Sequence, residues 1–327
     1  MQTNNKNNRF QSSLAPLMEQ FIHEKRACGY KYHAEARLLA SFDRFLSNEV
    51  MHPKELLQST TEKWLAKQPH EKAITQHRRI SIVRQFAIFM SHQGYRADVP
   101  EGSLGTKKDN VFLPRILTHT EIKHLLQAVD KIQPNARSPL RHLIMPEVFR
   151  LLYGCGFRLN EVLNLHVADV DLNQGVLTVR QGKFGKDRLV PPALALVVRL
   201  QKYAADFGVR SSDAIFFPSQ HGGPWSIKTV YSLFRQLLLE CEIPHAGRGK
   251  GPRVHDLRHT FAVHTLLHWY REGADIDAKL PVLATYLGHQ SLAGTQRYLH
   301  LTAELFPEIE LRINATFGDA IPRRITL

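Results

Sequence analysis

The sequence predicts a mainly α-helical protein with one small antiparallel β-sheet, divided into a helical amino-terminal domain and a mixed α+β domain. Apolar residues recur at helical spacing through most of the chain, whereas one region carries short strand-like runs. At 327 residues the chain is long enough for two domains of ordinary size, and a hydrophobic content of 43% can supply a core for each.

The first domain is expected over residues 1–97. From Leu14 to Tyr95 the apolar residues follow the 3.6-residue helical period, which predicts a small four-helix module whose last helix ends at Gly94. Cationic side chains mark the polar side of that last helix, and each of them taken singly is typical of a solvated helix face. They are His77, Arg78, Arg79 and Arg84.

A linker is expected over residues 98–114, because "RADVPEGSLGTKKDNVFLP" has no periodicity and is rich in Gly, Pro and charge. The second domain is then expected over 115–327. Thr118 and Glu121 have the spacing of a capping box, which predicts the start of its first helix. Another helix is predicted to open at Ser138 and Pro139 and to run to Leu152.

The strand-like runs lie in the second domain. "GVLTVRQ" and "DRLVP" are joined by the Gly-bracketed "GKFGK", which predicts a β-hairpin. The run "AIFFP" is compatible with a strand or with an extended buried segment. Helices are predicted to follow each other over most of the remainder, at 193–207, 226–240 and 255–269.

The charge balance favours a polyanionic partner. The chain has 43 Lys and Arg against 30 Asp and Glu, a net charge of +13, and both the first 100 residues (15 basic, 9 acidic) and the remainder (28 and 21) carry the excess. Cys28, Cys155 and Cys241 lack paired spacing, so we expect reduced, packed thiols. Neither a signal peptide nor a run of 18 apolar residues is evident, so a cytoplasmic protein without a membrane span is expected.

Three places in the second domain collect polar residues of catalytic type. Arg158 follows two glycines at the start of a helix, with Glu161 one turn on; Lys183 lies at the hairpin tip; and His255 and Arg258 share one helix face. Each also has a structural interpretation, such as a surface ion pair or an ordinary turn lysine.

Two other site classes are less favoured. Two i,i+4 pairs among His255, His259, His264 and His268 suggest a metal-binding face, but no Cys or carboxylate stands at ligand spacing, so no metal is predicted. The basic loop "GRGKGPR" is rich in glycine, yet it does not match the phosphate-binding P-loop pattern. No cofactor is therefore expected.

A tyrosine completes the set. In "YLGHQSLAGTQRYLHL", His289 precedes Tyr298 by nine residues, and the tyrosine is expected at the end of a short turn rather than in a core. An isolated phenol has a pKa near 10 and is a poor nucleophile. Arginines, a lysine and histidines supply what its attack on a DNA phosphodiester would need: a charge clamp, an acid and a base.

These motifs resemble those of the phage-integrase family of tyrosine recombinases, over essentially the whole chain. The matching segments are "GFRLNEV", "HDLRHTFA" and "LGHQSLAGTQRYLH". The resemblance implies a core-binding domain over 1–97 and a catalytic domain, with a carboxy-terminal tail, over 115–327. Two departures lie in "CGFRLN", which lacks the family's usual neighbours of the arginine, and in a longer segment before His289, which favours a transposon-borne member.

The same resemblance implies a role for each matching position. Arg158 and Arg258 would clamp the scissile phosphate, and Glu161 would brace the helix. Lys183 would be the general acid, with Lys186 as the alternative in the same hairpin. His255 would act as acid or base near the nucleophile, His289 would hydrogen-bond the phosphate, and Tyr298 would form a 3′-phosphotyrosyl bond.

The resemblance implies that the partner is double-stranded DNA with inverted half-sites, bound by a dimer on one site and by a homotetramer on two. Sister recombinases or DNA-bending proteins are further implied partners, and the implied location is the cytoplasm of a bacterium, at the nucleoid. DNA contacts are expected from basic residues on helices and in the Gly-rich loop: Arg78, Arg84, Lys228, Arg235, Arg248, Lys250 and Arg253. Two alternatives stay open: an accessory protein of a mobile element that binds DNA without cutting, and a type IB topoisomerase. The tail after Tyr298 has an apolar periodicity that suits packing on its own domain or on a neighbouring subunit.

Overall fold

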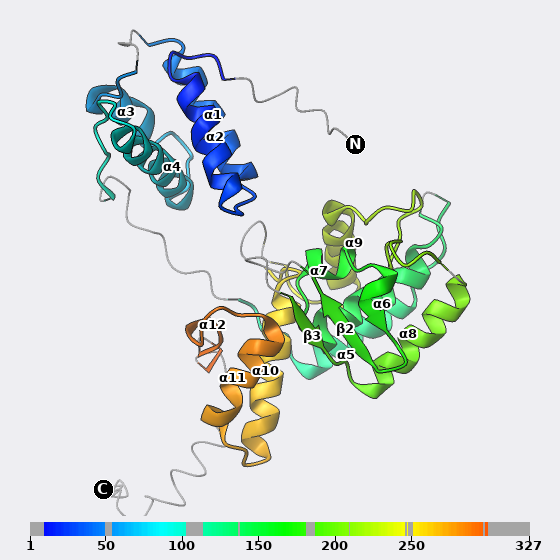
Figure 1. The fold of residues 1–327 in the computed structure, drawn as a ribbon. Coiled ribbons are helices and arrows are strands. Elements are labelled where there is room, and N and C mark those ends of the chain that lie inside the picture. Colours follow the sequence, from blue (N-terminus) through cyan, green and yellow to red (C-terminus); the bar gives the residue numbers. More distant parts are fainter. Residues whose placement is uncertain are drawn as a thin grey trace, which may run out of the picture. The chain divides into compact units, whose positions relative to one another are not determined.

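A computed structural model describes residues 10–49, 54–102, 114–136, 138–180, 187–208, 210–245, 247, 251–296 and 298–299 of the chain (Figure 1). The chain divides into two compact units, Met1–Phe112 and Leu113–Leu327. The predicted fold class, mainly helical with one small antiparallel sheet, is confirmed.

The first unit contains four helices among its described residues, as the periodicity predicted. They are α1 (Ala15–Ala27), α2 (His33–Leu46), α3 (Gln58–Leu65) and α4 (Ala73–His92). Their apolar faces meet in one core in which aromatic rings contact each other edge-on, tilted or stacked; Phe21, for example, packs edge-on against Phe86 at 5.6 Å between ring centroids.

One cation of α4, Arg79, does not lie on a solvated helix face, so the sequence-based interpretation was wrong for this residue. Arg79 is 4% exposed, and its guanidinium forks onto Glu71 at 2.8 and 2.7 Å, donates to the carbonyls of Trp64 and Ala66, and lies 4.7 Å from the Trp64 ring. The position lies on the side of α4 that packs against α3, so its charge is held by the end of α3 rather than by water.

The second unit is larger and mixes helices with the sheet. Its described helices are α5 (His119–Asp130), α6 (Arg141–Gly154), α7 (Leu159–Leu163), α8 (Leu194–Phe207), α9 (Ile227–Glu240), α10 (Asp256–Arg271), α11 (Ile276–Leu287) and α12 (Ala293–Gln296). The predicted capping box opens α5: Thr118 Oγ1 accepts from the backbone of Glu121 at 3.1 Å, and the Glu121 carboxylate accepts from that of Thr118 at 2.8 Å.

The sheet has three short strands in the order β1 (Val170–Asp171), β2 (Val176–Val179) and β3 (Arg188–Val190). Both pairings are antiparallel, and Leu177 pairs with Val190, which confirms the β2–β3 hairpin. Its connection, residues 181–186, lies outside the described residues. The "AIFFP" run is not part of the sheet; it pairs with the segment after α7 through one bridge, between His166 and Ile215, and the backbone of Phe216 donates to the carbonyl of Leu165 at 2.7 Å.

Two apolar clusters fill the second unit. The larger is built on α5, α6, α8, α9 and the sheet, and the smaller lies between α10 and α11 and includes the ring of Tyr298. Of the three cysteines, all free, Cys155 is buried but Cys28 is exposed, contrary to the expected packed thiol. Within the described part of the chain no helix is both long and apolar enough to cross a bilayer.

Candidate active site

Arg158 is held at the entrance to α7 by the carboxylate of Glu161. This carboxylate accepts from the backbone N–H of Arg158 at 2.9 Å and from its Nη1 at 2.7 Å. The chain reaches this point through Gly156, whose φ is +61° and whose Cβ, if present, would lie 2.6 Å from Phe261. Only glycine fits there, so the turn before Arg158 depends on it.

A second arginine, which sequence reasoning did not single out, holds the other side of Glu161. Arg188 on β3 forks onto this carboxylate, with Nη1–Oε1 at 3.0 Å and Nη2–Oε2 at 2.7 Å. Its Nε donates to the carbonyl of Tyr286 at 3.0 Å, and its guanidinium lies 5.8 Å from the ring centroid of Phe157. The sequence signal was an arginine inside a short strand followed directly by apolar residues.

Arg258, on the first turn of α10, is 1% exposed. Its Nη1 donates to the carbonyl of Gly156 at 2.6 Å and its Nη2 to that of Leu287. The Nη2 of Arg158 donates to the carbonyl of Gly288 at 3.1 Å. Arg158 and Arg258 therefore meet at the end of α11, although they lie 100 residues apart in the chain.

The three guanidiniums form a centre of positive charge. Their described hydrogen-bond partners include one carboxylate, Glu161, so three positive charges and one negative charge leave a net +2. Burial alone would raise the pKa of Glu161, but the hydrogen bonds and charges of Arg188 and Arg158 outweigh it and lower that pKa to about 2. Burial and the charge of Arg158 lower the pKa of Arg258 to about 9, so it stays protonated at neutral pH.

His255 stands immediately before α10, beside this centre. Burial, followed by the positive charges of Arg258 and Arg158, lowers the pKa of His255 to about 4. Its imidazole is therefore neutral at physiological pH, and it can accept a proton or donate one hydrogen bond. Its ring meets that of His259 edge-on, with 4.8 Å between centroids.

The structure places Tyr298 in a core, contrary to the expected surface turn. The side chain is 1% exposed and packs in the cluster between α10 and α11, two residues after the four-residue helix α12. Its hydroxyl lies 3.0 Å from Nδ1 of His259, itself 6% exposed. Sequence reasoning considered His259 for metal binding only. The available signal was its position next to Arg258 in the second motif.

His289 follows the left-handed Gly288 that caps α11. Its Nδ1 lies 2.7 Å from Oγ1 of the fully buried Thr295, and its ring centroid is 6.0 Å from that of Tyr298. The structure therefore brings together Arg158, Glu161, His255, Arg258, His289 and Tyr298, and adds Arg188 and His259. Lys183 and its alternative Lys186 lie outside the described residues.

The basic residues expected to contact DNA occupy different environments. Lys228 and Arg235 are seven residues apart on the exposed side of α9, and Arg78 lines a groove of about 820 Å³ in the first unit together with Lys25 and Arg37. Arg84 donates to the carbonyl of Pro100, and Nε and Nη2 of Arg253 both donate to Oδ1 of the buried Asp256. Arg248 and Lys250 lie outside the described residues.

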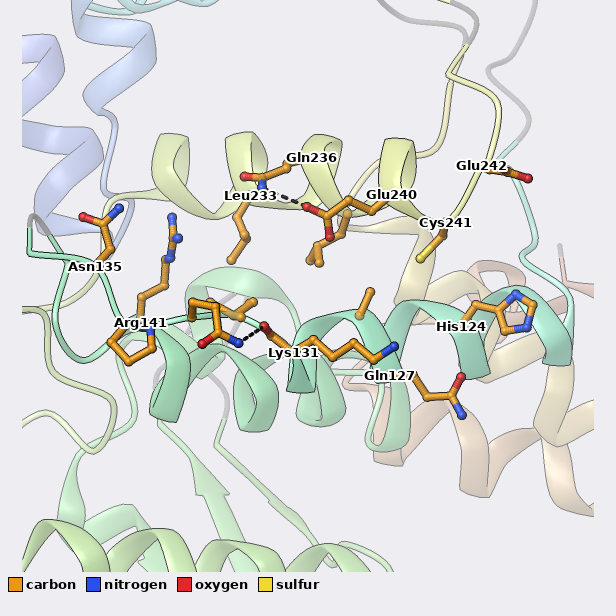
Figure 2. A pocket seen from close by; sticks show the side chains of 15 residues that line it. His124, Gln127, Lys131, Asn135, Arg141, Leu233, Gln236, Glu240, Cys241 and Glu242 are labelled. Carbon is orange, nitrogen blue, oxygen red and sulfur yellow. Dashed lines mark hydrogen bonds between the residues drawn. The ribbon is translucent and has the colours of Figure 1, made fainter.

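Another groove, of about 630 Å³, lies between α5 and α9 (Figure 2). Cations and carboxylates both line it, among them Lys131, Arg141, Glu240 and Glu242, so it lacks the excess positive charge of the arginine centre. None of the residues predicted to be catalytic lies among those that line it. Among the described residues, no three His, Cys, Asp or Glu side chains are grouped so that they could hold a metal ion.

Comparisons with known proteins agree with these motifs. The family model described as "Phage integrase family" matches residues 115–304. The chain is 31% identical to the putative integrase/recombinase y4rB of Sinorhizobium fredii over 94% of its length and 99% of that protein's. It is 34% identical to tyrosine recombinase XerD of Proteus mirabilis, over 71% and 70% of the two chains.

Solved structures share the fold. A crystal structure of the XerH site-specific recombinase bound to a palindromic difH substrate superposes with a TM-score of 0.63 at 20% identity, covering 91% of this chain and 84% of that one. The Tn1549 transposon integrase in complex with transposon right end DNA superposes with a TM-score of 0.60 at 16% identity, covering 86% and 94%.

Proposed function

The chain belongs to the phage integrase family and is a tyrosine recombinase, and from this premise we propose that it cuts and rejoins DNA at specific sites through a 3′-phosphotyrosyl intermediate. The observation that supports this most is the arginine centre. Three guanidiniums surround one carboxylate, and the net +2 of this group suits an anion such as a phosphodiester. Beside this centre, the hydroxyl of Tyr298 contacts His259, whose ring meets that of His255.

In the cleavage step the hydroxyl oxygen of Tyr298 attacks the scissile phosphorus, and the bond to the 5′ oxygen breaks. The phenolic proton passes to Nδ1 of His259, which already lies 3.0 Å from it. Arg158 and Arg258 bind the nonbridging oxygens and offset the charge that builds in the transition state. Rejoining reverses the step: a 5′ hydroxyl attacks the phosphotyrosine and the tyrosine recovers its proton.

The leaving 5′ oxygen needs a proton as well. We assign this to Lys183, as the family resemblance implies, with Lys186 as the alternative in the same hairpin. His255 and His289 complete the site: neutral His255 lies against the ring of His259, and His289, whose Nδ1 contacts Thr295, is assigned to the phosphate as the family resemblance implies. In this assignment the base is His259, one turn after His255 on α10.

The burial of Tyr298 has a mechanistic consequence. Tyr298 and Arg258 are each 1% exposed, so neither can meet a phosphate in the described conformation, and the segment around Tyr298 must move or open when DNA binds. Only a short helix, α12, precedes the tyrosine, so the movement would break few helical hydrogen bonds.

The first unit is proposed as the core-binding domain and the second as the catalytic domain, both contacting double-stranded DNA with inverted half-sites. Exposed Arg78, Lys228 and Arg235 are suited to these contacts. The protein would bind one site as a dimer and two sites as a tetramer, in the bacterial cytoplasm. The tetramer would exchange strands in integration, excision or transposition of a mobile element. The Tn1549 neighbour is a transposon integrase, which supports the last of these roles.

Covalent trapping tests the proposal. The protein is incubated with nicked duplexes tiled across the DNA that flanks its gene, denatured, and examined for a protein–DNA adduct, with Tyr298→Phe in parallel. We expect an adduct with the native protein and none with the variant. An adduct that survives in Tyr298→Phe would move the nucleophile to another residue. Tight binding without any adduct would favour the accessory DNA-binding protein instead.

A further inference from the structure

Arg188 uses its guanidinium differently from Arg158 and Arg258. All three of its nitrogens donate to protein: Nε to the carbonyl of Tyr286, and Nη1 and Nη2 to the two oxygens of Glu161. In Arg158 and Arg258, by contrast, the described donors are Nη1 and Nη2 alone, which leaves Nε for a phosphate. Arg188 is thus suited to holding other groups rather than substrate.

The three arginines meet at one short piece of backbone, the end of α11. The consecutive carbonyls of Tyr286, Leu287 and Gly288 each accept from a different arginine: from Arg188, Arg258 and Arg158 in turn. The last carbonyls of a helix lack partners within it and carry partial negative charge, so they attract cations. This helix end therefore sets where both proposed phosphate-binding arginines lie.

We propose that Arg188 is a positioning residue for strand cleavage, which ties the end of α11 and the carboxylate of Glu161 to strand β3. This inference rests on the proposed function. Without Arg188, the carboxylate of Glu161 loses its forked partner and Arg158 loses the fixed acceptor that orients it. The carbonyl of Tyr286 is released at the same time, so the neighbouring carbonyls that hold Arg158 and Arg258 are less well fixed.

The strand that carries Arg188 adds a second consequence. β3 begins two residues after the hairpin connection 181–186, which contains Lys183 and Lys186 and lies outside the described residues. The contact of Arg188 with Glu161 links β3 to α7, the helix that Arg158 precedes. Arg188 thereby joins the part of the chain assigned to the acid with the part assigned to the phosphate clamp.

Gly288 shows how closely this arrangement is packed. A Cβ on Gly288 would lie 3.0 Å from Cδ, 3.1 Å from Nη1 and 3.2 Å from Nε of Arg188, and its φ of +67° disfavours other residues. Gly288→Ala would therefore press on the guanidinium without removing it. We expect it to slow cleavage in the same way as a change at Arg188, though less.

A matched control exists in the same unit. Arg199 forks onto Glu147, a carboxylate as buried as Glu161, with Nε–Oε2 at 3.1 Å and Nη2–Oε1 at 2.6 Å. This pair joins α8 to α6. The described ion pairs of Arg199 are with Glu147 and Asp130, and neither is a proposed catalytic residue. Arg199→Met removes a fork of the same geometry from an equally buried carboxylate, with the arginine 43% exposed against 9% for Arg188, so it measures the effect of losing such a fork away from the proposed site.

The experiment compares Arg188→Met, Arg188→Lys and Arg199→Met in single-turnover cleavage of the nicked duplex that traps the native protein. DNA affinity at fixed salt and the thermal midpoint are measured on the same samples. We expect Arg188→Met to cleave about 100-fold more slowly at unchanged affinity, since small displacements of catalytic groups have effects of this size. Lys cannot fork, so Arg188→Lys should recover little of the rate. Arg199→Met should stay within about threefold.

A double variant separates positioning from general damage. If Arg188 acts through Glu161, then Glu161→Gln combined with Arg188→Met should be no slower than the slower single variant. The inference is overturned if the losses of cleavage rate in Glu161→Gln and Arg188→Met multiply in the double variant. It is also overturned if Arg188→Met and Arg199→Met lose rate equally, or if Arg188→Met cleaves at the native rate. If the native protein itself forms no adduct, the proposed function fails instead, and the two failures are thereby distinguished.

Discussion

Helix α10 carries two buried histidines that make the same hydrogen bond and have different surroundings. Nδ1 of His259 lies 3.0 Å from the hydroxyl of Tyr298, and Nδ1 of His264 lies 2.9 Å from that of Tyr153. Both histidines are less than 8% exposed. Five residues correspond to about 140° around a helix, so the two pairs lie on different sides of α10.

Their neighbours set the pairs apart. His259 follows Arg258 and meets the ring of His255, whereas the ring of His264 stacks on that of His119 at 3.8 Å. Tyr153 is part of the fourteen-residue helix α6, whereas Tyr298 comes after a single helical turn. A histidine–tyrosine hydrogen bond is therefore not sufficient for a nucleophile. The arginine centre and the short helix before Tyr298 distinguish the proposed site.

The two tyrosines provide the largest expected difference. Tyr298→Phe should reduce adduct formation below detection, because no oxygen remains to attack phosphorus. Tyr153→Phe should leave the cleavage rate within about threefold and lower the free energy of unfolding by roughly 1 kcal/mol, the cost of one lost hydrogen bond. Trapping assays and urea titrations of both variants measure this. Loss of cleavage in Tyr153→Phe alone would invert the comparison.

The two histidines should differ by less. His259→Gln should slow single-turnover cleavage by about 100-fold or more, since general base catalysis contributes effects of this order. His264→Gln should cleave within about threefold of the native rate while unfolding at lower urea concentration, because it disturbs the Tyr153 contact. If both variants cleave at the native rate, His255 becomes the better candidate for the base.

The smallest expected effect is the contribution of His264 to the loss of stability in acid. Burial, followed by the charges of His119 and Arg271, lowers the pKa of His264 to about 4. An unfolded histidine titrates at about 6.5, so the unfolded state binds more protons between these values. The stabilisation is complete above about pH 6.5 and is lost as the pH falls toward 4.

The measurement is the urea midpoint at pH 7 and at pH 5 for the native protein and His264→Gln. The drop between the two values should be smaller in the variant. His255, whose pKa is also lowered to about 4, still contributes to the drop in both proteins. An unchanged drop would show that His264 does not titrate in this range.

Local structure was predictable because its signals are local. The periodicity of the first 95 residues predicted four helices, the spacing of Thr118 and Glu121 predicted a capping box, and the glycines between two apolar runs predicted a hairpin. The family was predictable from three short motifs for the same reason. Arg79, taken for a solvated cation, shows the limit: its burial depends on how α3 packs against α4.

By itself the sequence determined the fold class, the family and the types of residue available for chemistry. Only the tertiary structure decided that Tyr298 is buried against His259 and that Arg188, Arg258 and Arg158 end on three successive carbonyls. The physical reason is that every residue has a backbone carbonyl, so the type of the accepting residue does not indicate that an arginine binds it. Which carbonyl it meets, 98 or 130 residues away, depends on the packing of α11 against β3 and α10.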